Sequence, residues 1–303
     1  GFIEAVRKMA ELPSDVPVTM GQPGAFTSFF GPDPLNLLGV VILTSLGTWG
    51  LPQMIGKFYA IKDEKAINTG TVISTLFACV VAGGSYFLGG FGRLFDGKAI
   101  YDETGNVVFD RIIPHMLSSL PDILIGIVVV LVLSASMSTL ASLVLTSSST
   151  LTLDFLKDNV MKEMSEKKQV RTMQVLIVFF IVVSVVIALD PPTFIAQLMG
   201  ISWGALAGAF LAPFLYGLYW RGVTKAAVWA SFIAGVGITV SNMFFHYIAS
   251  PINAGAIAMI AGLVVVPVVS VVTPKLKKER VEDIFSCYEE KVTITKKRSL
   301  EAN

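Results

Sequence analysis

The chain has 303 residues, 53% of them hydrophobic and only 15% charged, with a mean hydropathy of +0.71. A soluble domain would carry about a quarter charged residues, so this composition excludes an ordinary soluble protein and predicts an all-α, polytopic integral membrane protein. The net charge of +1 argues against a nucleic-acid partner. Two isolated cysteines and two distant histidines predict neither a disulfide nor a His- or Cys-based metal site.

Apolar stretches long enough to cross a bilayer recur along the whole chain. The predicted spans are 35–56, 68–91, 119–153, 171–189, 193–219, 226–248 and 254–273. Before them, 1–34 is amphipathic and has no signal-peptide pattern, and we expect the chain to be the C-terminal part of a longer protein. A polar loop is predicted at 92–113, with a turn at Thr104–Asn106. The tail from Lys275 onward is expected to have no apolar face.

The first predicted span is interrupted by the sequence GTWGLPQ at 47–53. Pro52 lacks a backbone donor, and Gly47 and Gly50 lower helix propensity further. One interpretation is an ordinary proline kink. The other is a discontinuous helix that lines a transporter binding site, since broken backbone at membrane depth is tolerated where it lines a cavity or is buried in protein. The hydroxyls of Thr44 and Thr48 just before the break favour the second interpretation.

The third predicted span carries many hydroxyl groups and no charge in its second half. On a helix, one face collects the small and hydroxyl residues spaced by three or four positions. These are Ala135, Ser138, Thr139, Ser142, Thr146 and Ser149. Such a face can pack against another helix through small residues, or its oxygens can coordinate a hard cation such as Na⁺.

Lysine and arginine distribute unevenly between the two sets of alternate loops. With seven spans, 18 of the 23 basic residues fall on one side, which the positive-inside rule assigns to the cytoplasm. We therefore expect the chain to lie in the plasma (inner) membrane. The segment 1–34 and the loop 92–113 would be outside the cell, and the loop 154–171 and the tail 274–303 would be in the cytoplasm.

Three segments in order resemble the sodium:solute symporter family, most closely its sodium/proline symporter branch. SASMSTLAS (134–142) is similar to the segment on the family's eighth core helix, and GTWGLPQMIGKFYA (47–60) to its broken sixth core helix. SWGALAGAFLAPFLYGLYW (202–220) is similar to the tenth core helix. The resemblance covers nearly the whole chain.

The resemblance implies a LeuT-like symporter fold of two inverted five-helix repeats. Residues 35–219 would be core helices six to ten, the second inverted repeat, and 220–273 two accessory transmembrane helices. The first repeat, which supplies the other half of the sodium and solute sites, would lie in the missing N-terminal half. This chain by itself is therefore expected not to transport.

The resemblance also implies roles for particular residues. The sodium ligands would be the carbonyl of Ala135 and the hydroxyls of Ser138 and Thr139. The substrate-side aromatics of the proline branch fall here on Thr48 and Thr44, so the substrate-binding set would be Thr44, Thr48, Trp49 and Pro52, next to the helix-break glycines Gly47 and Gly50.

Together these features predict Na⁺-coupled symport of a small organic solute, a proline-like amino acid or a carboxylate, by alternating access. No intramembrane nucleophile–base pair or paired acids are present, which argues against a membrane enzyme. The alternative is a truncated or non-transporting symporter-like protein with a sensory or structural role.

Overall fold

The computed structural model describes residues 1–56, 58, 61, 63–95, 100–103, 105 and 107–288. Within them every regular element is helical, and an isolated bridge between Tyr101 and Val107 is the sole β-pairing. The chain forms two compact units. Unit 1 comprises Gly1–Val41 and Pro52–Gly200, and unit 2 comprises Ile42–Leu51 and the chain from Ile201 onward.

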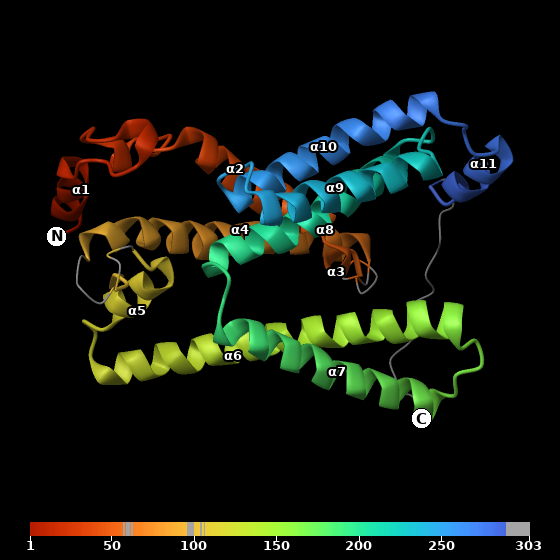
Figure 1. Ribbon diagram of the computed structural model, residues 1–303, viewed down its shortest axis with the longest axis horizontal. Coiled ribbons are helices and arrows are strands. Elements are labelled where there is room, and N and C mark those ends of the chain that lie inside the picture. The colour runs from red at the N-terminus through yellow and green to blue at the C-terminus, as the bar shows by residue number, and fades with distance from the viewer. Residues whose placement is uncertain are drawn as a thin grey trace. The chain divides into compact units, whose positions relative to one another are not determined.

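Unit 1 holds the first half of the chain's long helices (Figure 1). Its helices are α1 (Phe2–Glu11), the first part of α2 (Pro34–Gly50), α3 (Pro52–Ile55), α4 (Glu64–Gly90), α5 (Ile112–Leu117), α6 (Asp122–Ser149), a π-helix (Thr150–Val160) and α7 (Glu166–Leu189). Short 3₁₀ turns at Pro17–Thr19, Ala25–Thr27, Phe91–Leu94 and Phe109–Arg111 connect them.

Unit 2 is built on three long helices and receives the end of α2. Its helices are α8 (Ile195–Tyr219, which begins in unit 1), α9 (Lys225–Phe245), α10 (Pro251–Val272) and α11 (Lys278–Ser286). Helices α9 and α10 run side by side along their length (Figure 1). Within this unit α8 packs with α9 and α10.

The prediction of an all-α polytopic membrane protein is confirmed. Among the described residues, six helices are long and apolar enough to cross a membrane. The remaining predicted span, the first one at 35–56, corresponds to α2, a shorter apolar helix that ends at Gly50, with Leu51 non-helical and α3 beginning at Pro52. The predicted interruption of this span is therefore present, one residue before the proline, where the ring no longer clashes with a preceding helical turn.

Several predicted boundaries are shifted by a few residues, and one expectation was wrong. The third span begins at Asp122 rather than 119, because Pro121 occupies the N-cap position, and it continues beyond 153 as a π-helix to Val160. The fourth span begins at Glu166, five residues early. The tail was expected to have no apolar face, yet α11 forms within it, and its Phe285 ring lies 5.2 Å from the Arg221 guanidinium.

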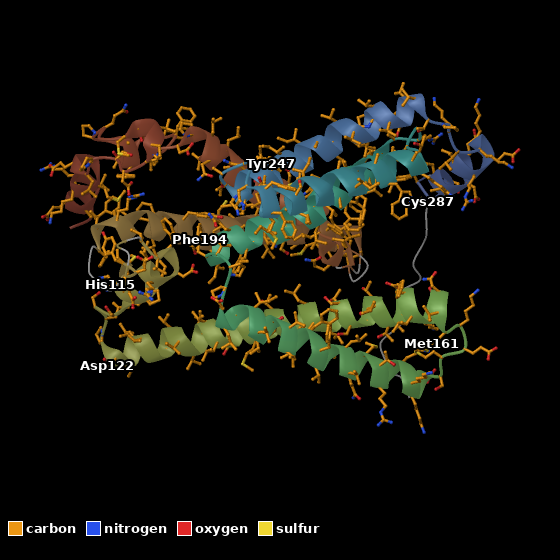
Figure 2. All side chains as sticks on the ribbon, viewed as in Figure 1. His115, Asp122, Met161, Phe194, Tyr247 and Cys287 are labelled. Carbon is orange, nitrogen blue, oxygen red and sulfur yellow. The ribbon has the colours of Figure 1, made fainter. Side chains whose placement is uncertain are left out.

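Helix α6 and α7 form an antiparallel pair (Figure 1). Figure 2 labels Asp122 and Met161 at the two ends of the 39-residue helix that α6 and the π-helix make together. About 20 residues are enough to span the hydrocarbon, so the end that carries Asp154 and Lys157 extends beyond it. The buried residues of this helix, Val144, Ser148 and Thr152, recur every four positions and therefore lie along one side of it.

In unit 1, the segment 1–34 is attached to the end of α4. Arg93 donates two hydrogen bonds to the Asp15 carboxylate, at 2.8 and 3.0 Å, and its guanidinium lies 4.0 Å from the centre of the Phe26 ring. Near the other end of the following loop, the Ile195 N–H at the start of α8 donates to Asp110, and Phe109 packs on Phe194, which Figure 2 labels. The loop 92–113 is thus contacted near its first residues by the segment 1–34 and near its last residues by the turn after α7.

Glycines let the backbones of α8, α9 and α10 approach closely. A Cβ added at Gly235 would lie 2.2 Å from the carbonyl carbon of Gly208, and one at Gly204 would lie 2.5 Å from the Gly255 Cα. Helices in a membrane associate through such small-residue contacts, because lipid gives no hydrophobic drive between apolar helices. The core of unit 2 lies beside them, at Ala212, Ala227 and Val266.

Two prolines interrupt the hydrogen-bond ladders of these helices, and each freed carbonyl has a partner. Pro213 in α8 leaves the Ala209 carbonyl without its helical donor, and the buried Ser231 hydroxyl of α9 donates to it at 3.4 Å. Pro267 in α10 frees the Leu263 carbonyl, to which the Tyr216 hydroxyl of α8 donates at 3.0 Å. Helix-interior proline is tolerated in membranes when neighbouring hydroxyls satisfy the carbonyl in this way.

Removing both hydroxyls with Ser231→Ala and Tyr216→Phe is expected to lower the melting temperature of the protein in detergent. Each substitution leaves a buried carbonyl unpaired, at a cost of about 1 kcal/mol. Fluorescence-monitored thermal unfolding measures the effect, with Ser184→Ala as the control at an exposed hydroxyl that donates to the Phe180 carbonyl of its own helix. Equal melting temperatures for the double variant and the control would contradict the role of these two hydroxyls as donors to the carbonyls that the prolines free.

Candidate functional site

The hydroxyl face of α6 is regular and uncovered. Residues 135–149 are α-helical throughout, so the predicted spacing does place Ala135, Ser138, Thr139, Ser142 and Thr146 on one side. All five are exposed in the described structure, whereas Val144 and Ser148 on the opposite side are buried. Among the described residues, no element covers the oxygen-rich face of α6.

The three predicted sodium ligands lie on neighbouring positions of one helical face, and two of them are hydrogen-bonded to each other. The Ser138 hydroxyl donates to the Ala135 carbonyl at 2.9 Å, and Thr139 follows directly on the same face. Further along, Thr146 donates to the Ser142 carbonyl in the same manner. A hydroxyl that donates to its own helix keeps lone pairs free to accept, so its oxygen can still contact a cation.

The donor set suits a monovalent hard cation. Hydroxyl and carbonyl oxygens are ligands for hard cations, and neutral oxygens hold them more weakly than carboxylates do. Among the described residues no cluster of three or more His, Cys, Asp and Glu side chains is placed to hold a transition metal or a tightly bound divalent ion. One helix turn offers three oxygens, fewer than the six or more that a hard cation such as Ca²⁺ takes, so this set alone could supply only part of a coordination shell.

The helix break has a buried face and an exposed face, both within unit 2. Leu43, Gly47, Gly50 and Leu51 are buried. A Cβ added at Gly50 would lie 2.7 Å from both the Cα and the Cβ of Ala207 on α8. At Gly47 it would meet the side-chain ends of Met259 and Trp203 at 3.3 and 3.4 Å. The two glycines thus let the end of α2 approach α8 and α10 closely.

The predicted substrate residues flank this packed face. Thr44 and Thr48, one turn apart, are half-buried, and the Thr48 hydroxyl donates to the Ser45 carbonyl at 3.0 Å. Trp49 lies about 100° further round than Thr48 and is 60% exposed. Pro52 is exposed at the start of α3. The structure therefore brings Thr44 and Thr48 together and separates Trp49 from them. The sodium residues belong to unit 1, whereas the break residues as far as Leu51 belong to unit 2.

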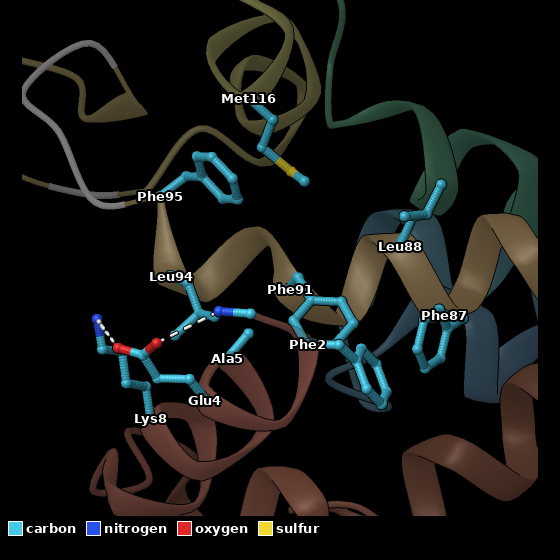
Figure 3. Close-up of a pocket in the computed structure, with 11 residues that line it drawn as sticks. Phe2, Glu4, Ala5, Lys8, Phe87, Leu88, Phe91, Leu94, Phe95 and Met116 are labelled. Carbon is cyan, nitrogen blue, oxygen red and sulfur yellow. Dashed lines mark hydrogen bonds and ion pairs between the residues drawn. The ribbon is translucent and has the colours of Figure 1, made fainter. Parts of the chain in front are cut away.

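An apolar hollow of roughly 550 Å³ lies elsewhere in unit 1, between α1, the end of α4 and α5 (Figure 3). Phe2 packs between Phe87 and Phe91, with ring centroids 5.7 and 6.1 Å apart, and Met116 closes the opposite side. At its rim the Glu4 carboxylate pairs with the Lys8 ammonium at 3.5 Å. The hollow holds neither the hydroxyl face nor the helix break.

The sequence did not predict which side chains hydrogen-bond to the carbonyls freed by helix-interior prolines, or which side chains join the loops to neighbouring segments. They are Ser231, Tyr216, Arg93 and Asp110. A signal existed for the first two: a helix-interior proline frees the carbonyl four residues earlier, which requires some hydroxyl from a neighbouring helix. Which helix supplies it is decided only by packing.

Known proteins were compared with the chain. A sequence profile described as "Sodium:solute symporter family" matches residues 1–235. The chain is 28% identical over 271 residues to the sodium/pantothenate symporter of Haemophilus influenzae, covering 86% of this chain and 53% of that protein. It is 27% identical over 258 residues to the sodium/proline symporter of Staphylococcus aureus, covering 81% and 49%. The chain thus spans about half the length of these curated relatives.

No solved structure matches the chain. The family profile covers well over half of the sequence, and the curated relatives are symporters, which are transporters and not enzymes. The expected resemblance is therefore confirmed: this chain belongs to the sodium:solute symporter family.

Proposed function

We propose that this chain forms the second half of a symporter that couples the entry of Na⁺ to the uptake of a small organic solute by alternating access. The observation that supports this proposal most directly is the uncharged oxygen face of α6, where the Ala135 carbonyl and the hydroxyls of Ser138 and Thr139 share one exposed turn. The remaining oxygens would come from the N-terminal half that the curated relatives have in addition. Binding of Na⁺ and solute to one conformation raises the affinity of each for the other by the same factor.

The solute class we propose is a proline-like amino acid or another carboxylate. The two named relatives carry proline and pantothenate, and both molecules have a carboxylate. At the break after α2, Thr44 and Thr48 offer hydroxyls and Trp49 an apolar ring on an adjoining face. A small polar solute with an apolar body fits groups of these two kinds.

An imposed Na⁺ gradient should drive solute uptake by the complete gene product in proteoliposomes. The measurement is accumulation of radiolabelled proline or pantothenate with inward Na⁺, compared with an equal K⁺ gradient. Accumulation that requires Na⁺ supports symport, and competition between the two solutes identifies the preferred one. Equal accumulation in both gradients would contradict coupling to Na⁺, and no accumulation with a range of amino acids and carboxylates would favour the non-transporting alternative.

We further propose that the protein lies in the plasma (inner) membrane with the segment 1–34 and the loop 92–113 outside, and with the chain after α10 in the cytoplasm. Two sets of contacts support this arrangement. The bonds of Arg93 to Asp15 and of Ile195 to Asp110 join segments expected on the outer side. The bond from the Tyr288 hydroxyl to the Leu218 carbonyl joins two expected on the inner side. The final residues, 289–303, lie outside the described part of the chain.

Impermeant thiol labelling of intact cells tests this topology. In a Cys79→Ser background, a cysteine placed at the exposed Glu103 should react, while the exposed native Cys287 should react only after the membrane is permeabilised. The cause is the cost of translocating short basic segments. The reverse pattern would invert the orientation, and labelling of both positions would mean that one span between them has been miscounted.

A further inference from the structure

A basic cluster gathers at one end of unit 2. Immediately after α10 the chain carries Lys275, Lys277, Lys278 and Arg280. The α8–α9 loop adds Arg221 and Lys225 at the same end. That loop is joined to the end of α10, because the Thr224 and Thr273 hydroxyls are 2.6 Å apart and the Thr224 N–H donates to the Ser270 hydroxyl at 3.3 Å.

Helix α11 is held against this loop by two contacts. The Tyr288 hydroxyl donates to the Leu218 carbonyl at 3.0 Å, and the Arg221 guanidinium lies 5.2 Å from the centre of the Phe285 ring. Since α8, α9 and α10 are membrane-spanning, these contacts keep α11 at the level where the helices leave the bilayer. The basic residues therefore lie next to lipid headgroups.

The residues of α11 are sorted by charge around its axis. At about 100° per residue, Val281, Ile284 and Phe285 share one face, and Glu279, Glu282 and Asp283 share the opposite face. Lys278 and Arg280 lie on the two boundaries between them. This arrangement, apolar side chains flanked by cations with acids turned away, is the pattern of a helix that lies in a membrane surface.

The charges are available for a partner. None of Lys275, Lys277, Lys278 and Arg280 forms an ion pair with another described residue, and the acids of α11 are likewise unpaired there. Part of the apolar face is also uncovered, since Ile284 is 55% exposed. A neutral apolar contact would leave the cations unused, and a soluble anion would leave the apolar face in water.

We propose that α11, together with the Lys275–Arg280 segment and the Arg221–Lys225 loop, binds the anionic phospholipid headgroups of the surrounding bilayer. Basic residues just outside a membrane span attract such lipids, and the attraction falls off within a Debye length of about 8 Å at physiological salt. The apolar face of α11 would enter the boundary between headgroups and acyl chains, and its acidic face would remain in water. This surface shares no residue with the proposed sodium and solute sites and does not depend on which solute is carried.

The native Cys287 at the end of α11 reports on this contact, because it is exposed and next to Tyr288. The full protein, with Cys79→Ser and an environment-sensitive fluorophore on Cys287, is titrated with phosphatidylglycerol in neutral detergent micelles. Emission should shift to shorter wavelength and saturate. Phosphatidylcholine with the same acyl chains, and soluble glycerol 3-phosphate, should give no saturable shift.

The triple substitution Lys275→Gln, Lys277→Gln and Lys278→Gln should raise the phosphatidylglycerol concentration for half-maximal shift at least about tenfold. The matched control is Lys162→Gln, Lys167→Gln and Lys168→Gln, which removes the same charge from the α6–α7 loop and should leave the titration unchanged. Phosphatidylglycerol should also raise the melting temperature of the parent more than that of the triple variant. Equal shifts with both lipids, a shift with glycerol phosphate, or equal titrations of the triple variant and the parent would overturn the proposal.

Discussion

Replacing Gly50 with leucine is expected to abolish solute uptake and to lower the melting temperature in detergent. Gly50 is buried where the end of α2 meets α8, and even a Cβ there would lie 2.7 Å from the Cα of Ala207 and 2.9 Å from the Cβ of Leu211. The clash involves backbone, which cannot rotate away as a side chain can. We expect a loss of about 3 kcal/mol or more, at the upper end of overpacking effects.

Gly237→Leu is the matched control for this prediction. It makes the same change in a membrane helix of the same unit, but nothing lies within 4 Å of a Cβ added at Gly237. That variant should unfold near the parental temperature. Gly50→Ala, which adds only the clashing carbon, should fall between the parent and Gly50→Leu. If Gly50→Leu keeps both uptake and melting temperature, the end of α2 does not pack on α8 as described.

Removing either of the two neighbouring hydroxyls of α6 is expected to weaken the binding of Na⁺ during uptake. Ser138→Ala and Thr139→Ala should each raise the Na⁺ concentration for half-maximal uptake about tenfold, which corresponds to about 1.4 kcal/mol for one lost oxygen ligand. The double variant should be affected more strongly than either. Thr139→Ser keeps the hydroxyl on the same exposed turn and should be milder. Initial uptake rates measured over a range of Na⁺ concentrations test this directly.

Ser148→Ala separates ion binding from helix packing. Ser148 lies on the opposite face of α6, fully buried, and donates to the Val144 carbonyl at 2.7 Å. Its loss should reduce stability while leaving the half-saturating Na⁺ concentration unchanged. Unaltered Na⁺ dependence in both the Ser138 and the Thr139 alanine variants would mean that the hydroxyl face serves packing alone.

Local chemistry in the sequence was enough to predict the long apolar helices, the break after α2 and the hydroxyl face of α6. A chain in lipid must satisfy its backbone within each helix, so long apolar runs become spans almost irrespective of their neighbours. Pro52 cannot continue a helix, and the break accordingly falls at Leu51. The positions from Ala135 to Thr146 share a face simply because the helical repeat places them there.

Contacts between distant residues were decided only by the tertiary structure. The sequence marks Gly50 as a helix breaker, but only the position of Ala207, more than 150 residues later, makes it a site of close packing. Similarly, Pro213 predicts a freed carbonyl at Ala209, while the choice of Ser231 as its donor depends on how α8 and α9 cross. The apolar face of α11 was missed because a nine-residue helix rich in charge is marginal alone; its contacts with Leu218 and Arg221 supply the stabilisation that local propensity lacks.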